Sequence, residues 1–86
     1  MASMDFRSSV LRIVRVIPKG KTLSYGEVAR QAGFPGAARA AGTVLKGNFD
    51  PAIPCHRVIR ANGTPGEYNR GERLKYELLR KEGAML

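Results

Sequence analysis

The chain contains one cysteine and one histidine, and the two are neighbours, Cys55 and His56. A thiol is a useful nucleophile only as the thiolate, and an ordinary thiol pKa of about 8.5 leaves little thiolate at neutral pH. A neighbouring imidazole is the usual group that takes up this proton. The pair therefore indicates nucleophilic sulfur chemistry, although a buried free cysteine followed by a polar strand residue is the alternative interpretation.

The composition argues against disulfide and zinc chemistry. A single cysteine cannot close an internal disulfide, and one Cys with one His falls short of the four ligands of a structural zinc site. A disulfide and a structural zinc site are therefore not expected, and a reducing intracellular setting fits best. No apolar run approaches the roughly 18 residues of a membrane span, so no membrane is expected as a partner.

The charge balance is strongly basic. Fifteen Lys and Arg residues stand against seven Asp and Glu residues, which gives a formal net charge of +8 on 86 residues. Such an excess on a small domain indicates a polyanionic partner, and nucleic acid is the first candidate. A soluble protein that is merely basic is the alternative.

The pattern of apolar residues predicts one domain, residues 1–86, that is mainly helical. Apolar side chains recur at helical spacing over residues 6–17. Ser24 and Glu27 form a capping-box pattern, in which the serine hydroxyl accepts from the Glu27 amide and the Glu27 carboxylate reaches back. We expect a second helix to follow from this cap through residue 32.

A third helix is predicted over residues 37–46, and with the helix before it forms a helix-turn-helix. A short strand is expected over residues 55–59. The last helix should cover residues 72–81, with Glu77 paired to Lys81 one turn later. The predicted fold is a small winged-helix-like helix-turn-helix domain, with a short strand or loop segment that carries the cysteine and a C-terminal helix.

Several motifs follow one another in a fixed order along the chain. They are Gly20-Lys21-Thr22, Ser24–Ala29, Ala37–Gly42, Gly47-Asn48, Pro54–Ile59, Asn62-Gly63, Gly66 with Tyr68, and Lys75–Leu79 with Glu82-Gly83. In this order they resemble the C-terminal DNA-binding and active-site domain of the O6-alkylguanine-DNA alkyltransferases, over about residues 5–83. That family usually carries an N-terminal domain ahead of this one, so the chain is expected to be a natural minimal form or an excised domain. The resemblance likewise implies no metal and no cofactor.

The resemblance implies a role for each residue of the candidate catalytic group. Cys55 would accept the alkyl group, His56 would take its proton through a bridging water, and Glu82 would orient and polarise His56. Asn48 would tie the helix-turn-helix to the active-site segment by hydrogen bonds. Tyr25 would donate to the flipped guanine and help to rotate the nucleotide out of the duplex.

The resemblance also implies a DNA-binding helix. Arg39 would enter the stack that the flipped base has left and face the orphaned cytosine. Small residues on the same helix would let its backbone approach the minor groove, where little sequence reading is expected. The remaining residues expected at this DNA surface are Ala37, Ala38, Gly42 and Thr43.

The substrate pocket is expected to contain four residues that follow the cysteine in the sequence. By resemblance, the Val58 carbonyl would read the guanine amino group, Tyr68 would wall the pocket, and the Asn69 amide would point at the guanine oxygen. Arg70 occupies a position where small residues are common, so it either narrows the pocket against bulky adducts or contacts phosphate. We predict that methyl adducts react faster than benzyl adducts. Phe49 stands where the family usually has proline, and the stretch from there to the cysteine is one residue short.

Each assignment has a simpler alternative when its residue is taken alone. Tyr25 at a helix start could pack on the core, and Arg39 could be a solvated helix residue. Glu82 near a helix end could be a surface carboxylate. Asn48 could be a plain helix C-cap, and Tyr68 a loop anchor. Their joint occurrence at matching spacing favours the site.

Three functions are compatible with these residues. The first is single-turnover repair, in which a methyl or alkyl group passes irreversibly from O6-alkylguanine in DNA to Cys55 of a monomer, in the cytoplasm at the nucleoid or in the nucleus. The second is an alkyltransferase-like sensor that grips the lesion without transfer and flags it for nucleotide-excision-repair proteins. Such sensors typically have Trp in place of the cysteine. The third is a winged-helix regulator of undamaged DNA, which leaves the Cys–His pair unexplained.

Overall fold

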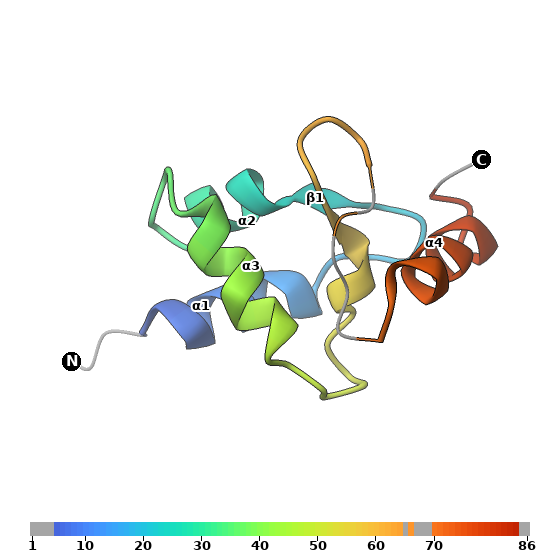
Figure 1. Cartoon of the computed structure of the whole chain (residues 1–86). Helices are drawn as coiled ribbons and strands as arrows, with labels where there is room; N and C mark the ends of the chain where they lie inside the picture. The colour runs from blue at the N-terminus through green and yellow to red at the C-terminus, as the bar shows by residue number, and fades with distance from the viewer. Residues whose placement is uncertain (1–4, 65, 67–69, 85–86) are drawn as a thin grey trace.

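The computed structural model describes residues 5–64, 66 and 70–84, and these residues are mainly helical, as predicted. Their elements, in chain order, are α1 (Phe6–Arg15), β1 (Leu23–Ser24), α2 (Tyr25–Gln31), α3 (Ala38–Lys46), the 3-10 turn η1 (Cys55–Arg57), β2 (Val58–Ile59) and α4 (Glu72–Lys81). Helices α1, α2 and α3 gather at one end of the molecule and α4 lies at the other (Figure 1). The segment that carries Cys55 runs between these two groups.

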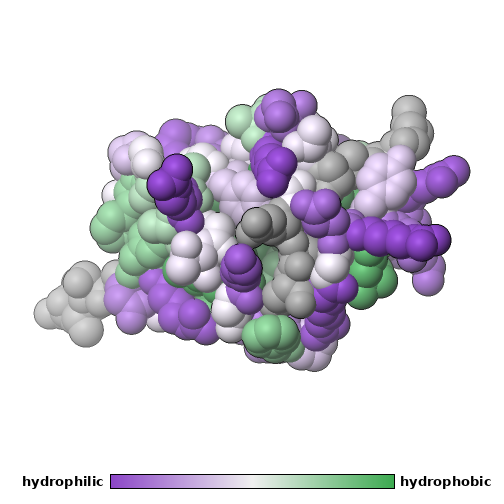
Figure 2. Space-filling view, in the orientation of Figure 1, coloured by the Kyte–Doolittle hydropathy of each residue, from purple (hydrophilic) through white to green (hydrophobic). Residues whose placement is uncertain are grey.

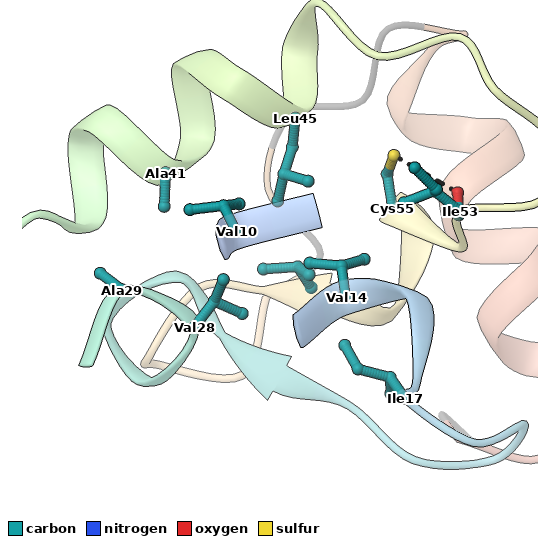
Figure 3. Packing of buried hydrophobic residues seen from close by; sticks show 10 residues of the cluster. Val10, Val14, Ile17, Val28, Ala29, Ala41, Leu45, Ile53 and Cys55 are labelled. Carbon is teal, nitrogen blue, oxygen red and sulfur yellow. Dashed lines mark hydrogen bonds between the residues drawn. The ribbon is translucent and has the colours of Figure 1, made fainter. Parts of the chain in front are cut away.

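The core lies among the first three helices. Val10 and Val14 of α1 are fully buried, and Ala41 and Leu45 of α3 pack into the same cluster. Figure 3 shows these side chains converging with those of α2, while Cys55 stands at the edge of the cluster. The helical spacing of the apolar residues explains this arrangement, because one stripe on each helix is turned inward. The first helix ends at residue 15, two residues earlier than expected.

Helix α2 begins as the sequence predicts. The Ser24 hydroxyl oxygen accepts a hydrogen bond from the Glu27 amide at 3.0 Å. The expected reach of the Glu27 carboxylate back to the cap is wrong, because that carboxylate accepts from Arg30 Nε at 2.8 Å and from Gln31 Nε2 at 3.0 Å. The long side chains of Arg30 and Gln31, one turn further along the helix, bind this carboxylate in place of the cap.

The predicted strand over residues 55–59 is only half correct. Residues Cys55–Arg57 form a 3-10 turn, in which the Arg57 amide donates to the Pro54 carbonyl at 3.0 Å. Only Val58–Ile59 is a strand, and it pairs in parallel with β1 in the register Leu23 to Val58 and Ser24 to Ile59. Cys55 therefore stands on a tight turn, directly before the strand that pairs with β1, the strand that leads into α2.

Helix α4 has the predicted bounds, but its surface differs from the prediction. The ion pair on this helix joins Arg73 Nε to Glu77 at 3.3 Å, so the expected pairing of Glu77 with Lys81 is wrong. The buried positions of the helix are Lys75 and Leu79, both without exposed surface. A lysine thus takes part in the inward face of α4.

Candidate active site and nucleic-acid interface

The Cys55 thiol is buried and hydrogen-bonded. Cys55 is 8% exposed, and its Sγ accepts from Asn48 Nδ2 at 2.8 Å. Sγ also lies 3.5 Å from the Ile53 carbonyl oxygen, to which the thiol can donate, as Figure 3 shows. These two contacts hold the sulfur in place.

Asn48 links this sulfur to the helix-turn-helix. Its amide donates to the Leu45 carbonyl at 3.1 Å, directly after α3 ends. Its side-chain oxygen accepts from the Asp50 amide at 3.3 Å while its Nδ2 reaches the thiol. The segment that is one residue short still allows this bridge. Phe49, at the usual proline position, is 63% exposed.

His56 and Glu82 are paired across the fold. His56 Nε2 lies 2.9 Å from Glu82 Oε2, and both side chains are largely buried. Hydrogen bonds from Arg57, and then from His56, lower the pKa of Glu82 to about 2. The carboxylate is therefore ionised at any working pH and can orient the imidazole. Among the described residues the hydrogen-bond partners of the sulfur are Asn48 and Ile53, and the His56 ring is not one of them.

Tyr25 lies at the start of α2, against a buried lysine of α4. Lys75 Nζ donates to the Tyr25 hydroxyl oxygen at 3.0 Å and stands 5.3 Å from the centre of its ring. Burial lowers the pKa of Lys75 to about 8; the Arg60 charge adds to this effect, while Cys55 and Glu72 act in the opposite direction. A polarisable hydroxyl and a cation that titrates near neutrality thus share one face of the site.

A cavity of about 760 Å³ connects α3 with the thiol. Its wall contains five predicted site residues together with Cys55; they are Tyr25, Ala38, Arg39, Gly42 and Thr43. The charged residues of this wall are all cations, Arg39, Lys46 and Arg60, within the described part of the chain. The side of the molecule drawn in Figure 2 carries hydrophilic side chains over much of its area. The cavity suits a polyanion that presents one group to the sulfur.

A family model described as the 6-O-methylguanine DNA methyltransferase DNA-binding domain matches residues 5–84. The chain belongs to this family. A curated relative, the methylated-DNA–protein-cysteine methyltransferase of Methanothermobacter thermautotrophicus, is 47% identical over 83 residues, which cover 95% of this chain and 46% of the relative. The chain spans about half the length of the first curated relatives that it matches.

Two solved structures have a similar fold. The Mycobacterium tuberculosis OGT in complex with DNA aligns with a TM-score of 0.88 and 43% identity, over 96% of this chain and 52% of that chain. The S. pombe ATL in complex with DNA aligns with a TM-score of 0.81 and 37% identity, over 96% of this chain and 80% of that chain. Both of those proteins were solved in complex with DNA.

The other predicted site residues are distributed differently. Arg70 and Cys55 both line a second, smaller cavity. Val58 is fully buried in β2, and Ala37 is half-buried at the N-cap of α3, packed against the core rather than in the larger cavity wall. Tyr68 and Asn69 lie outside the described residues.

Two residues of the site had no role in the sequence interpretation. Arg57 donates to Glu82 through Nε at 3.0 Å and Nη2 at 2.8 Å, and through Nη1 to the Ile17 carbonyl at 2.8 Å. Lys75 is the second. Arg57 could have been found from its place in the Pro54–Val58 motif. The signal for Lys75 was its position four residues before Leu79 on the apolar face of a helix.

Two broader features complete the site. In the described parts of the chain, no cluster of three or more His, Cys, Asp or Glu side chains is arranged to hold a metal ion. Among the same residues, no helix has the length and apolarity needed to cross a membrane.

Proposed function

We propose that this chain repairs DNA by moving an alkyl group from O6-alkylguanine irreversibly to Cys55. The observation that carries the proposal is the position of the sulfur, hydrogen-bonded by Asn48 and in the wall of the cationic cavity beside α3. Membership of the methyltransferase family supports it. The partner is double-stranded DNA that contains the lesion, bound by a monomer, and the protein acts at the nucleoid or in the nucleus.

The substrate base must leave the duplex before it can react. The alkyl carbon on guanine is inaccessible inside the stack, and extrusion costs a few kcal/mol, less at a damaged pair. Arg39 is exposed on α3 and lines the cavity, so it is suited to fill the gap in the stack. Ala38 and Gly42 line the same wall and have little side chain to keep the helix from the minor groove.

The chemical step needs one proton to leave sulfur and one proton to reach guanine. His56, oriented by Glu82, takes the thiol proton through water. The thiolate attacks the alkyl carbon, the S–C bond forms as the C–O6 bond breaks, and the electron pair remains on guanine. Tyr25 donates toward the ring, because a hydroxyl that accepts from Lys75 can still donate its own hydrogen. The reaction as proposed requires no cofactor and consumes the protein.

A lesion-binding sensor is the second candidate function. The chain covers 80% of the S. pombe ATL, a larger share than the 52% that it covers of the M. tuberculosis OGT. Binding without transfer would give the same DNA affinity and would leave the thiol unchanged. The presence of Cys55 beside His56 and Glu82 favours transfer.

The test is the intact mass of the protein after it is mixed with duplex DNA that carries one O6-methylguanine. We expect a stoichiometric gain of one methylene unit, mapped to Cys55 by peptide analysis. The Cys55→Ala variant should show no gain but keep its preference for lesion DNA. Lesion-selective binding without a mass gain in the unaltered protein would assign the chain to the sensors, and a gain mapped to another residue would remove Cys55 from its role.

A further inference from the structure

Cys55 borders two cavities. The larger one lies toward α2 and α3, and the smaller one, of about 140 Å³, lies toward the segment that precedes the cysteine. Cys55 is the residue common to both linings among the described residues. Asn48, His56 and Arg70 belong to the smaller lining only. The sulfur segment therefore separates a wide chamber open to the helix pair from a narrow one beside the proton relay.

The two cavities suit different parts of the substrate. The base arrives from the side of α3, so the larger cavity takes the guanine. Attack places sulfur, carbon and guanine oxygen nearly in line, so any atoms beyond the reacting carbon must point away from that line. The smaller cavity borders the same sulfur, and its 140 Å³ holds only a few heavy atoms. It is therefore suited to the tail of a short adduct.

The polar groups of the smaller cavity favour a negative tail. Toward the described residues the Arg70 guanidinium donates one hydrogen bond, from Nη2 to the Phe49 carbonyl at 3.4 Å, and a guanidinium has five donors. Among the described residues of this lining the single acid is Asp50, whose carboxylate accepts from the Ala52 amide at 2.9 Å. Arginine binds carboxylates by charge-assisted hydrogen bonds, often in pairs.

We propose that Arg70 makes this cavity selective for alkyl groups that end in a carboxylate. The inference rests on the proposed transfer to Cys55 and names a substrate class for it. The thiolate forms its bond to the first carbon of the tail, the C–O6 bond breaks, and guanine keeps the electron pair and takes up a proton. The carboxylate does not react, and Arg70 holds it beside the sulfur.

The experiment compares two adducts of the same shape in duplex DNA, O6-(2-carboxyethyl)guanine and its uncharged counterpart O6-(2-carbamoylethyl)guanine. The quantity measured is the ratio of their transfer rates to Cys55. We expect Arg70→Gln to lower this ratio about tenfold, since it removes the charge-assisted pair, and Asp50→Asn to raise it. Arg73→Gln removes the same charge from an exposed side chain of α4 outside this cavity, and should leave the ratio unchanged.

An equal slowing of both adducts in Arg70→Gln would overturn the proposal, because Arg70 would then act on shape alone. An equal fall of the ratio in Arg73→Gln would also overturn it, because the loss of any positive charge would then lower the ratio, whether or not that charge lies in the cavity. Binding of the two DNAs by Cys55→Ala gives a readout that does not require transfer, and the same tenfold loss with Arg70→Gln is expected there. If the protein fails to transfer a methyl group but still binds the two DNAs with this Arg70-dependent difference, the result counts against the proposed function and not against the role of Arg70.

Discussion

Glu82 serves two partners with one carboxylate. One of its oxygens lies 2.9 Å from the His56 ring and 2.8 Å from Arg57 Nη2, and the other accepts from Arg57 Nε at 3.0 Å. Because these groups are largely buried, the attraction between them is poorly screened by water. The same contacts that orient the His56 ring therefore also stabilise the fold.

Glu82→Gln should lower the free energy of unfolding by about 2 kcal/mol at pH 7. The pKa of Glu82 falls from 4.5 to about 2 on folding, so its contribution is complete above pH 4.5 and is lost as the pH falls toward 2. Chemical denaturation at pH 7 and at pH 2.5 measures the effect. The difference between variant and parent should shrink at the lower pH, and a constant difference would mean that ionisation is not its source.

Lys75→Met should raise the melting temperature at pH 7 and slow alkyl transfer. The folded pKa of about 8 lies below the unfolded 10.5, so the buried charge destabilises the fold below pH 8 and this cost disappears between pH 8 and 10.5. Thermal unfolding at pH 7 and 10.5 measures the gain, which should vanish at the higher pH. Lys81→Met, on the exposed end of α4, is the control. A loss of stability at pH 7 would show that the lysine stabilises the fold.

At the scale of elements, Gly66, which precedes α4 in the chain, lies close to side chains of the site. A Cβ at Gly66 would lie 3.2 Å from Arg60 Cγ and 3.3 Å from the Tyr25 ring, whereas a Cβ at Gly63 would meet nothing within 4 Å. Both glycines have positive φ angles, of 76° and 89°. The two positions therefore share the same backbone requirement and differ in their contact with Tyr25.

Gly66→Ala and Gly63→Ala should each cost about 1 kcal/mol of stability, because alanine is strained at positive φ. Only Gly66→Ala should slow transfer, since its methyl group displaces Tyr25 or Arg60. Denaturation and single-turnover rates on lesion DNA measure the two effects. Equal slowing in both variants would trace the loss to general destabilisation.

The DNA-facing helix allows a separate test. Arg39→Ala should weaken binding to a duplex lesion by about tenfold and leave the reaction with free O6-alkylguanine base nearly unchanged, because a free base needs no extrusion. Arg12→Ala on α1 removes an exposed arginine outside the larger cavity and serves as the control. Equal losses on both substrates would remove Arg39 from the base-flipping role.

For the whole molecule, charge should dominate affinity. Three cations line the larger cavity in the described chain, Arg39, Lys46 and Arg60, and the net charge is +8. If these three contact phosphate, the logarithm of the binding constant should fall with the logarithm of salt concentration at a slope of about −3. Fluorescence anisotropy on undamaged duplex measures it. A slope near zero would exclude binding through phosphate.

Local patterns predicted much of this molecule, and contacts between distant segments were the part that they missed. Helix α4 has its predicted bounds, and the Ser24 cap forms as expected, because both depend on neighbours in sequence. The pairing of His56 with Glu82 was predicted from the family resemblance, and the residues taken alone did not indicate it. The contacts of Lys75 and Arg57 were not predicted. Lys75 donates to the Tyr25 hydroxyl and Arg57 donates to the Ile17 carbonyl, and the sequence around each donor does not reveal its distant acceptor.

The two-residue parallel pair of β1 and β2 has a consequence for how the protein folds. Its register joins Leu23 to Val58, across a long stretch of chain that includes α2 and α3. Helices form in about a microsecond, whereas contacts between distant residues must first overcome the entropy of loop closure. We expect refolding in stopped flow to recover the helical circular dichroism before the protected state of the Cys55 thiol. The chain would then pass through a species with its helices formed and its nucleophile still open to any electrophile in solution.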